Sequence, residues 1–239
     1  MVHVRNVVAA GAPDASRVLT FGHSGWLWRN SYLLYDRETE SLWHHLTGRA
    51  MSGPLRGTAL RRLPTVLTNW AAWRAEHPRT LVLPRPPHGP RGEPTDVDGY
   101  AERTARRTVG YGIDVGDASR LYPPESPAAD GLVEEDVGGV PVVVARDAEG
   151  AAAHAFDRRV GGRTLSFERD TAGAPPRPVL RERGASRTWS LRSGRPLDPA
   201  DEPLGRLLGS PWETAAWTLQ HPAGTVHPGR PGDPPPSPR

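Results

Sequence analysis

Residues 18–49 read VLTFGHSGWLWRNSYLLYDRETESLWHHLTGR, and residues 164–195 read TLSFERDTAGAPPRPVLRERGASRTWSLRSGR. At this separation of 146 residues (18 to 164), leucine, phenylalanine and tryptophan recur at matching positions. The matched pairs are Leu19 with Leu165, Phe21 with Phe167, Arg37 with Arg183, Trp43 with Trp189, and Gly48-Arg49 with Gly194-Arg195. Self-similarity at a fixed separation predicts an internal duplication.

A second block matches at a separation of 144 residues (71 to 215): Ala71-Ala72-Trp73 with Ala215-Ala216-Trp217, and His77-Pro78 with His221-Pro222. Tryptophan is a rare residue, so two matched tryptophans in the same order favour duplication over chance. Residues present in both copies serve what both copies share, which is the fold. We therefore interpret as structural Phe21, Trp43, Trp73, His77, Phe167, Trp189, Trp217 and His221.

Each copy has the pattern of short strands followed by one helix. Strands are predicted over residues 18–21, 31–35, 41–44 and 80–83 in the first copy, and over 164–167, 188–191 and 225–226 in the second. Helices are predicted over 67–77, ending before Pro78, and over 212–220. Residues 140–145 (VPVVVA) predict a strand buried on both faces.

The expected fold class is α+β and β-rich: two tandem pseudo-repeats, each a small antiparallel sheet with one packed helix, sharing a core. Repeat 1 covers residues 1–83 and repeat 2 covers residues 132–226. Residues 84–131 form a linker and connecting segment that is rich in proline and glycine at its start. Residues 227–239 (HPGRPGDPPPSPR) predict a disordered tail.

The charge balance argues against a nucleic-acid partner. Thirty basic and 27 acidic residues leave a net charge of only +3, although the isoelectric point is about 9.8. The basic residues are all arginine and are scattered along the chain, whereas nucleic-acid binding requires them clustered on one face. The absence of lysine and the abundance of Arg, Ala, Gly and Pro are typical of a bacterial, GC-rich genome.

The chain has no cysteine, which excludes disulfides, thiolate nucleophiles and cysteine-ligated metals. No run of 18 apolar residues is present, so no transmembrane segment is expected. Residues 1–17 lack the apolar core of a signal peptide.

Several blocks in order resemble one known family. They are LTFGHSG (19–25), NS (30–31), YDRETESLW (35–43), TGRA (47–50), GPLRGT (53–58), WAAWRAEHP (70–78), VGGVPVVV (137–144) and AFDRRVGGRTL (155–165). Over residues 18–227 the chain is similar to the uncharacterised prokaryotic family catalogued as domain of unknown function 3179. The resemblance brings no reaction, and it implies an exported or envelope-associated protein.

The chain departs from that family at its start. The first copy in the family usually opens with a Cys-x-x-Cys-Asn-Ser-Ala-like strand and an Asp-Arg hairpin. The second copy here keeps the hairpin as residues 156–163, but residues 1–17 carry no match. We therefore expect the opening hairpin of repeat 1 to be missing or degraded, through a late start or a loss. If the cysteines of that segment form part of a site in relatives, this chain lacks that part.

Residues present in only one copy are the better candidates for function. In repeat 1 these are His23, Ser24, Asn30 and Ser41, with Asp36, which becomes the similar Glu182 in the second copy. Arg37, although matched by Arg183, completes the set of ligand-binding candidates. The segment Gly22–Gly25 has a structural interpretation as a tight turn between two strands, and Asp36 as a turn residue that binds backbone amides. Gly-His-Ser-Gly lacks the spacing of a hydrolase nucleophile elbow.

A metal site is the alternative. His23 with His44 or His45 and a carboxylate such as Asp36 could hold copper or non-haem iron in an oxidoreductase. Adjacent residues on a strand point to opposite faces, however, which argues against His44 and His45 sharing one ion. No other cofactor signature is present. The expected function is therefore binding of a small molecule or protein partner by repeat 1, with the metal-dependent oxidoreductase as second hypothesis.

Overall fold

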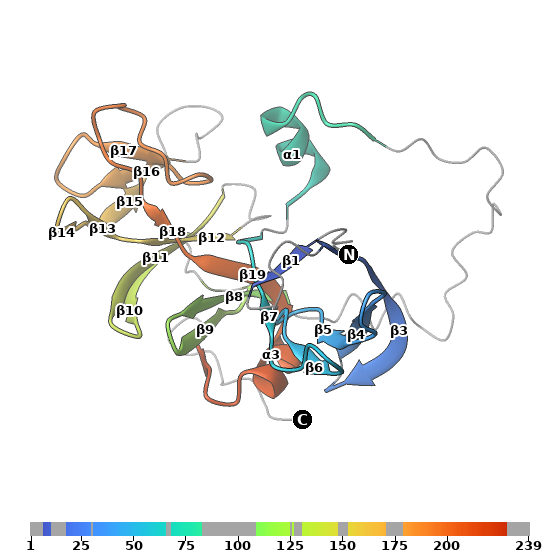
Figure 1. The fold of residues 1–239 in the computed structure, drawn as a ribbon. Helices are drawn as coiled ribbons and strands as arrows, with labels where there is room; N and C mark the ends of the chain where they lie inside the picture. The colour runs from blue at the N-terminus through green and yellow to red at the C-terminus, as the bar shows by residue number, and fades with distance from the viewer. Residues whose placement is uncertain are drawn as a thin grey trace, which may run out of the picture. The chain divides into compact units, whose positions relative to one another are not determined.

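The computed structural model describes residues 7–10, 18–29, 31–65, 68–82, 109–124, 126, 131–147, 153–170 and 179–228. In these residues the protein is β-rich, with several small antiparallel sheets and few helices (Figure 1). The one parallel pair among the described strands joins β9 (Ala118–Tyr122) to β20 (Thr225–Val226). The chain forms two compact units, residues 1–64 with 218–222, and residues 65–217 with 223–239.

The first unit is built on a four-stranded sheet in the order β3-β4-β5-β6. Its strands are β3 (Phe21–Trp28), β4 (Ser31–Asp36), β5 (Leu42–His44) and β6 (Ala50–Ser52), and a three-stranded sheet adds β1 (Val7–Ala10), β2 (Val18–Leu19) and β7 (Ala59–Leu60). Leu19, Trp43 and Ala50 form the buried core, against which Phe21, Leu34, Leu55 and Leu60 pack. Trp43 is therefore the centre of this unit.

The second unit contains two four-stranded sheets. One has the order β10-β11-β12-β18 and the other β19-β8-β9-β20. The strands not yet defined are β8 (Val109–Val115), β10 (Leu132–Val137), β11 (Val140–Arg146), β12 (Ala153–Asp157), β18 (Gly205–Arg206) and β19 (Leu208–Glu213). Smaller sheets pair β13 (Arg159–Val160) with β14 (Arg163–Thr164), and join β15 (Phe167–Arg169), β16 (Val179–Glu182) and β17 (Thr188–Ser190).

The strand β11 lies between the two hydrophobic clusters of this unit. Val143 and Ala145 belong to the cluster around Trp189, whereas Val142 and Val144 belong to the cluster around Tyr122. All four side chains are inaccessible to solvent. The prediction of a strand buried on both faces is confirmed, because alternating residues of a strand point to opposite sides.

Both predicted helices are present, shorter than predicted. They are α1 (Trp70–Glu76) and α3 (Thr214–Gln220), and Trp212, predicted as helical, lies in β19. Residues 225–226 form the predicted strand, but residues 80–82 do not. The segments 83–108 and 229–239, which hold most of the predicted linker and tail, lie outside the described residues. No helix in the described part of the chain could span a membrane.

Candidate functional site

Asp36, at the end of β4, is fully buried, and neutral donors surround its carboxylate. Oδ1 accepts a hydrogen bond from the backbone N of Thr39 at 2.6 Å, and Oδ2 accepts from Thr39 Oγ1 at 2.9 Å. Oδ2 also accepts from the indole Nε1 of Trp43 at 2.7 Å. Asp36 thus ties the turn that follows β4 to the core tryptophan, which agrees with its interpretation as a turn residue.

Ser41 is also fully buried, and it connects this turn to the loop after β6. Its Oγ lies 2.7 Å from Thr39 Oγ1 and accepts a hydrogen bond from the backbone N of Leu55 at 3.0 Å. The loop passes so close that a Cβ at Gly53, where φ is +88°, would lie 2.7 Å from the Ser41 Cα. Only glycine fits there, because both the space and the positive φ exclude a side chain.

Residues Gly22–Gly25 do not form a turn between two strands. They lie within the continuous strand β3, whose register against β4 shifts between His23 and Leu27. Ser24 Oγ donates to the carbonyl of Leu33 at 2.7 Å and accepts from the backbone N of Trp26 at 3.1 Å. Ser24 therefore stabilises a β-bulge, in which an extra residue has no ladder partner.

The two remaining ligand-binding candidates outside the rings are Arg37 and Asn30. Arg37 is exposed, and its guanidinium lies 5.9 Å from the centre of the Tyr35 ring. Asn30 lies outside the described residues.

The half-exposed surface of this sheet carries a row of rings. The His45 ring stacks on Tyr32, with ring centres 3.7 Å apart and planes inclined by 11°, and His45 Nδ1 lies 2.8 Å from the Tyr32 carbonyl. The His23 ring lies 5.3 Å from Tyr32. Leu27, which pairs with Tyr32 across the strands, is 72% exposed. We call His23, Tyr32 and His45 the Tyr32 face.

His44 is buried next to this face. Its Nδ1 lies 2.8 Å from Thr47 Oγ1, its ring packs edge-on to Trp28, and its Nε2 has no hydrogen-bond partner. Burial lowers the pKa of His44 to about 4, and the neighbouring His45 and His221 add to this effect. Burial also lowers the pKa of His45. Both rings are therefore neutral at pH 7, able to donate or accept a hydrogen bond without carrying charge.

The candidate metal ligands do not gather around one point. The ring centres of His44 and His45 are 5.7 Å apart, and each Nδ1 is held by another group. Asp36 is bound to Thr39 and Trp43. Within the described residues, no three histidine or acidic side chains form a group that could hold a metal ion.

A known family matches residues 4–217 of the chain, a range that includes the Tyr32 face, Asp36 and most of the second unit. The chain belongs to the family described as protein of unknown function (DUF3179). The predicted family is confirmed, and its description assigns no reaction. Neither the curated proteins nor the solved structures give a match.

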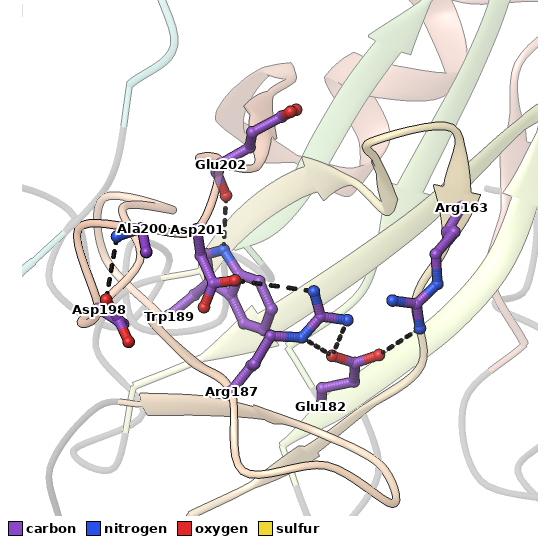
Figure 2. Close-up of polar contacts among 8 residues, drawn as sticks. All are labelled: Arg163, Glu182, Arg187, Trp189, Asp198, Ala200, Asp201 and Glu202. Carbon is purple, nitrogen blue, oxygen red and sulfur yellow. Dashed lines mark hydrogen bonds and ion pairs between the residues drawn. The ribbon is translucent and has the colours of Figure 1, made fainter.

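The family match also spans an ion-pair network in the second unit that the sequence did not reveal (Figure 2). Glu182, almost fully buried, lies between two guanidinium groups: one oxygen is 3.0 Å from Arg163 Nη2 and the other 2.6 Å from Arg187 Nε. Arg187 also lies 3.7 Å from Asp201, and the Trp189 indole donates to the Glu202 carbonyl at 2.9 Å. Arg187 is only five residues from Glu182, but Arg163 and Asp201 come from other segments, so no local motif predicts the whole network.

Tyr32 is the main residue of the site that the sequence analysis missed. Its signal was present, because alternation along residues 31–36 places Tyr32 on the same side of the strand as Leu34 and Asp36. The contact with His45 could not be predicted, since it depends on the register between β4 and β5.

Proposed function

We propose that this protein binds a small, uncharged, ring-shaped ligand at the Tyr32 face of its first unit. The observation that carries the proposal is the stack of His45 on Tyr32 beside the exposed His23. Flat rings offer a large contact area to another ring, and offset stacking adds to the apolar contact. The lowered pKa of His45 favours a neutral ligand, because its imidazole can offer a hydrogen-bonding nitrogen without charge, and the neutral, fully buried His44 adds no charge next to the face.

In this proposal the remaining candidates have supporting roles. Ser24 holds the bulge that presents Leu27, and Asp36 and Ser41 hold the turn between β4 and β5. They are buried or engaged with the backbone, so they position the face rather than contact the ligand. His23 and Arg37 are exposed, and Asn30 precedes β4; we retain these three as candidate contacts.

We further propose that the two halves of the chain are copies of one unit, with repeat 1 at 1–83 and repeat 2 at 132–226. Hydrogen bonds between corresponding residues, 146 positions apart in the two halves, support this. The backbone N of Asp36 donates to Ser41 O at 3.1 Å, and that of Glu182 to Arg187 O at 2.9 Å. Phe21 meets Trp43 edge-on at 5.7 Å, and Phe167 meets Trp189 edge-on at 5.5 Å.

Further equivalences support the duplication. The bond from Gly48 N to His44 O matches the bond from Gly194 N to Ser190 O, both of 2.8 Å. The bond from Leu60 N to Gly48 O also matches that from Leu204 N to Gly194 O, with the donors 144 residues apart (60 to 204) and the acceptors 146 apart (48 to 194). The two helices, over 70–76 and 214–220, also match at the separation of 144 residues.

The duplication makes the Tyr32 face a property of the first copy alone. The positions 146 residues after His23, His44 and His45 hold Arg169, Ser190 and Leu191. Leu191 is fully buried in the second hydrophobic core, where a histidine would be unfavourable. A surface found in only one of two copies is better explained by binding than by the shared fold.

A screen of neutral ring compounds, such as monosaccharides and uncharged aromatic amides, tests the proposal. Binding is followed by tryptophan fluorescence and by NMR of the histidine rings in the full chain. We expect at least one compound that binds the wild type and a His77→Ala control, but binds Tyr32→Ala at least about tenfold more weakly, equivalent to one ring-stacking contact. If every binding compound tolerates Tyr32→Ala, the proposal is wrong.

A further inference from the structure

A second site emerges in the second unit, around His154 of β12. The His154 side chain is only 4% exposed, and neither of its ring nitrogens has a hydrogen-bond partner. A buried polar group without a partner destabilises the folded state, and such groups are rare in native proteins. A ring with both nitrogens in this condition therefore requires an explanation, and a ligand that the ring can hydrogen-bond supplies one.

The strand register places a cation beside this ring. His154 and Phe156 point to the same side of β12, and Phe156 is paired with Arg206 of the neighbouring strand β18. Arg206 is thus the diagonal neighbour of His154, a distance that a long side chain spans easily. Arg206 is exposed, and its guanidinium has no hydrogen bond or ion pair with any residue that the structure describes.

A second cation approaches from the other neighbouring strand. Ala145 of β11 is paired with His154, so Asp147, two residues further on, lies on the same side. Arg192 Nη2 is 3.7 Å from the Asp147 carboxylate, which brings this guanidinium to the side of the sheet that carries His154. Both arginines act on the ring: burial lowers the pKa of His154 to about 4, and Arg206 and Arg192 contribute to the shift.

Arg206 also lies near a second buried donor. The Tyr111 hydroxyl has no hydrogen-bond partner, and burial raises its pKa to about 12 while Arg206 opposes the rise. A group beside His154 would therefore meet two guanidinium groups and an imidazole N–H, opposed by the carboxylate of Asp147, whereas Tyr111 belongs to the cluster on the other side of β12. A cationic ligand is disfavoured by this charge, and an anion is favoured.

We propose that His154, Arg206 and Arg192 form a binding site for a small oxyanion, the carboxylate, sulfate or phosphate group of a ligand. Guanidinium groups bind such oxyanions through paired, charge-assisted hydrogen bonds. The neutral imidazole adds one N–H donor, and Arg206 provides access from solvent. This site is separate from the Tyr32 face, so the two proposals stand or fall independently.

Sulfate is a suitable probe, because its charge is constant near neutral pH. The full chain is titrated with sulfate at constant ionic strength, and the ring signals of His154 are followed by NMR. We expect saturable shifts at His154, and binding weakened at least about tenfold by Arg206→Gln, as for the loss of one charge-assisted hydrogen bond. Arg195→Gln, another exposed arginine of the second unit, is the matched control and should bind sulfate like the wild type.

Three results would overturn the proposal: no saturable sulfate-dependent shift at His154, equal sulfate binding by Arg206→Gln and wild type, or equal weakening by Arg195→Gln. His154→Leu provides a second test, since it removes the buried polar ring but keeps its bulk. Sulfate should raise the melting temperature of the wild type more than that of His154→Leu, because only the wild type adds specific binding to the general stabilising action of sulfate. An equal rise in both proteins would assign the effect to the general action of sulfate on protein surfaces, and the site would be rejected.

Discussion

At the scale of single residues, burial separates the groups that build this protein from those that remain available to a ligand. Asp36 was selected from the sequence as a candidate contact, with a turn role as its structural interpretation, and its carboxylate is enclosed by Thr39 and Trp43. The sequence identified the turn because Asp at the start of a turn has a known local geometry. It could not predict the bond to Trp43, which depends on how β4 and β5 are paired.

Asp36→Ala should destabilise the folded protein by about 2–4 kcal/mol, because it leaves the Trp43 indole and the Thr39 amide buried without acceptors. Urea denaturation of the purified protein measures this change. Arg37→Ala, at the exposed neighbouring position, should change the free energy of unfolding by less than about 0.5 kcal/mol. Equal effects of the two substitutions would contradict the role assigned to Asp36.

Acid should destabilise the protein through His44. Its pKa is about 4 in the folded state and near the ordinary 6.5 in the unfolded state, so between these pH values the unfolded chain binds a proton that the folded chain does not. The contribution of neutral His44 to the free energy of unfolding is therefore fully present above pH 6.5. It is lost as the pH falls from 6.5 to 4, by up to about 1.4 kcal/mol per pH unit for one histidine. Denaturation between pH 7.5 and 4.5 should show a smaller slope for His44→Gln than for the wild type; an unchanged slope would refute this cause.

At the scale of elements, the two helices show how similar sequences, which share Ala-Ala-Trp, acquire different environments. WAAWRAE in α1 and TAAWTLQ in α3 predicted helices equally well. Trp217 of α3 is 1% exposed and packs edge-on to Trp212, whereas Trp73 of α1 is 39% exposed. Local pattern predicts that a helix forms, but what covers its apolar face is decided by strands distant in the sequence. For Trp217 one of these strands is β8, where a side chain at position 112 would collide with the indole, so that only a glycine fits there.

Trp217→Ala should therefore cost about 3–5 kcal/mol of stability, as for other fully buried tryptophans. Trp73→Ala should cost less than about 1.5 kcal/mol, since it loses partial burial and one hydrogen bond to Thr80. Thermal and urea unfolding of both variants measure the difference. A cost for Trp73→Ala equal to that of Trp217→Ala would mean that the face of α1 is covered in solution.

At the scale of the whole molecule, the β-rich class and the family could be predicted from the sequence, because both follow from patterns spread along the chain. The proposed duplication also distinguishes structural residues from candidate functional residues. The ring pairs Phe21–Trp43 and Phe167–Trp189 occur in both copies, whereas the imidazoles of the Tyr32 face occur in the first copy alone. The network around Glu182 and the ring of His154 could not be predicted. Their partners meet only through tertiary folding, and isolated Arg, Glu and His residues carry no local signal.

Replacing the imidazoles of the first copy with the residues of the second tests this division. The double variant His44→Ser, His45→Leu should keep the fold, because Ser190 and Leu191 occupy these positions in the second unit. It should lose binding of any compound that depends on Tyr32, since His45 no longer stacks there. Circular dichroism and the same fluorescence titration measure both properties, and a variant that folds and still binds normally would exclude a role for His45.

The central claim is that the Tyr32 face binds a neutral ring ligand, and NMR of the nine histidines during titration with a compound from the screen tests it most directly. We predict that the ring signals of His23, Tyr32 and His45 all shift saturably as the compound is added. The signals of His154 and His227, in the second unit, should not shift. Shifts confined to His154 or His227, or unchanged signals of His23 and His45 at saturating compound, would contradict the claim.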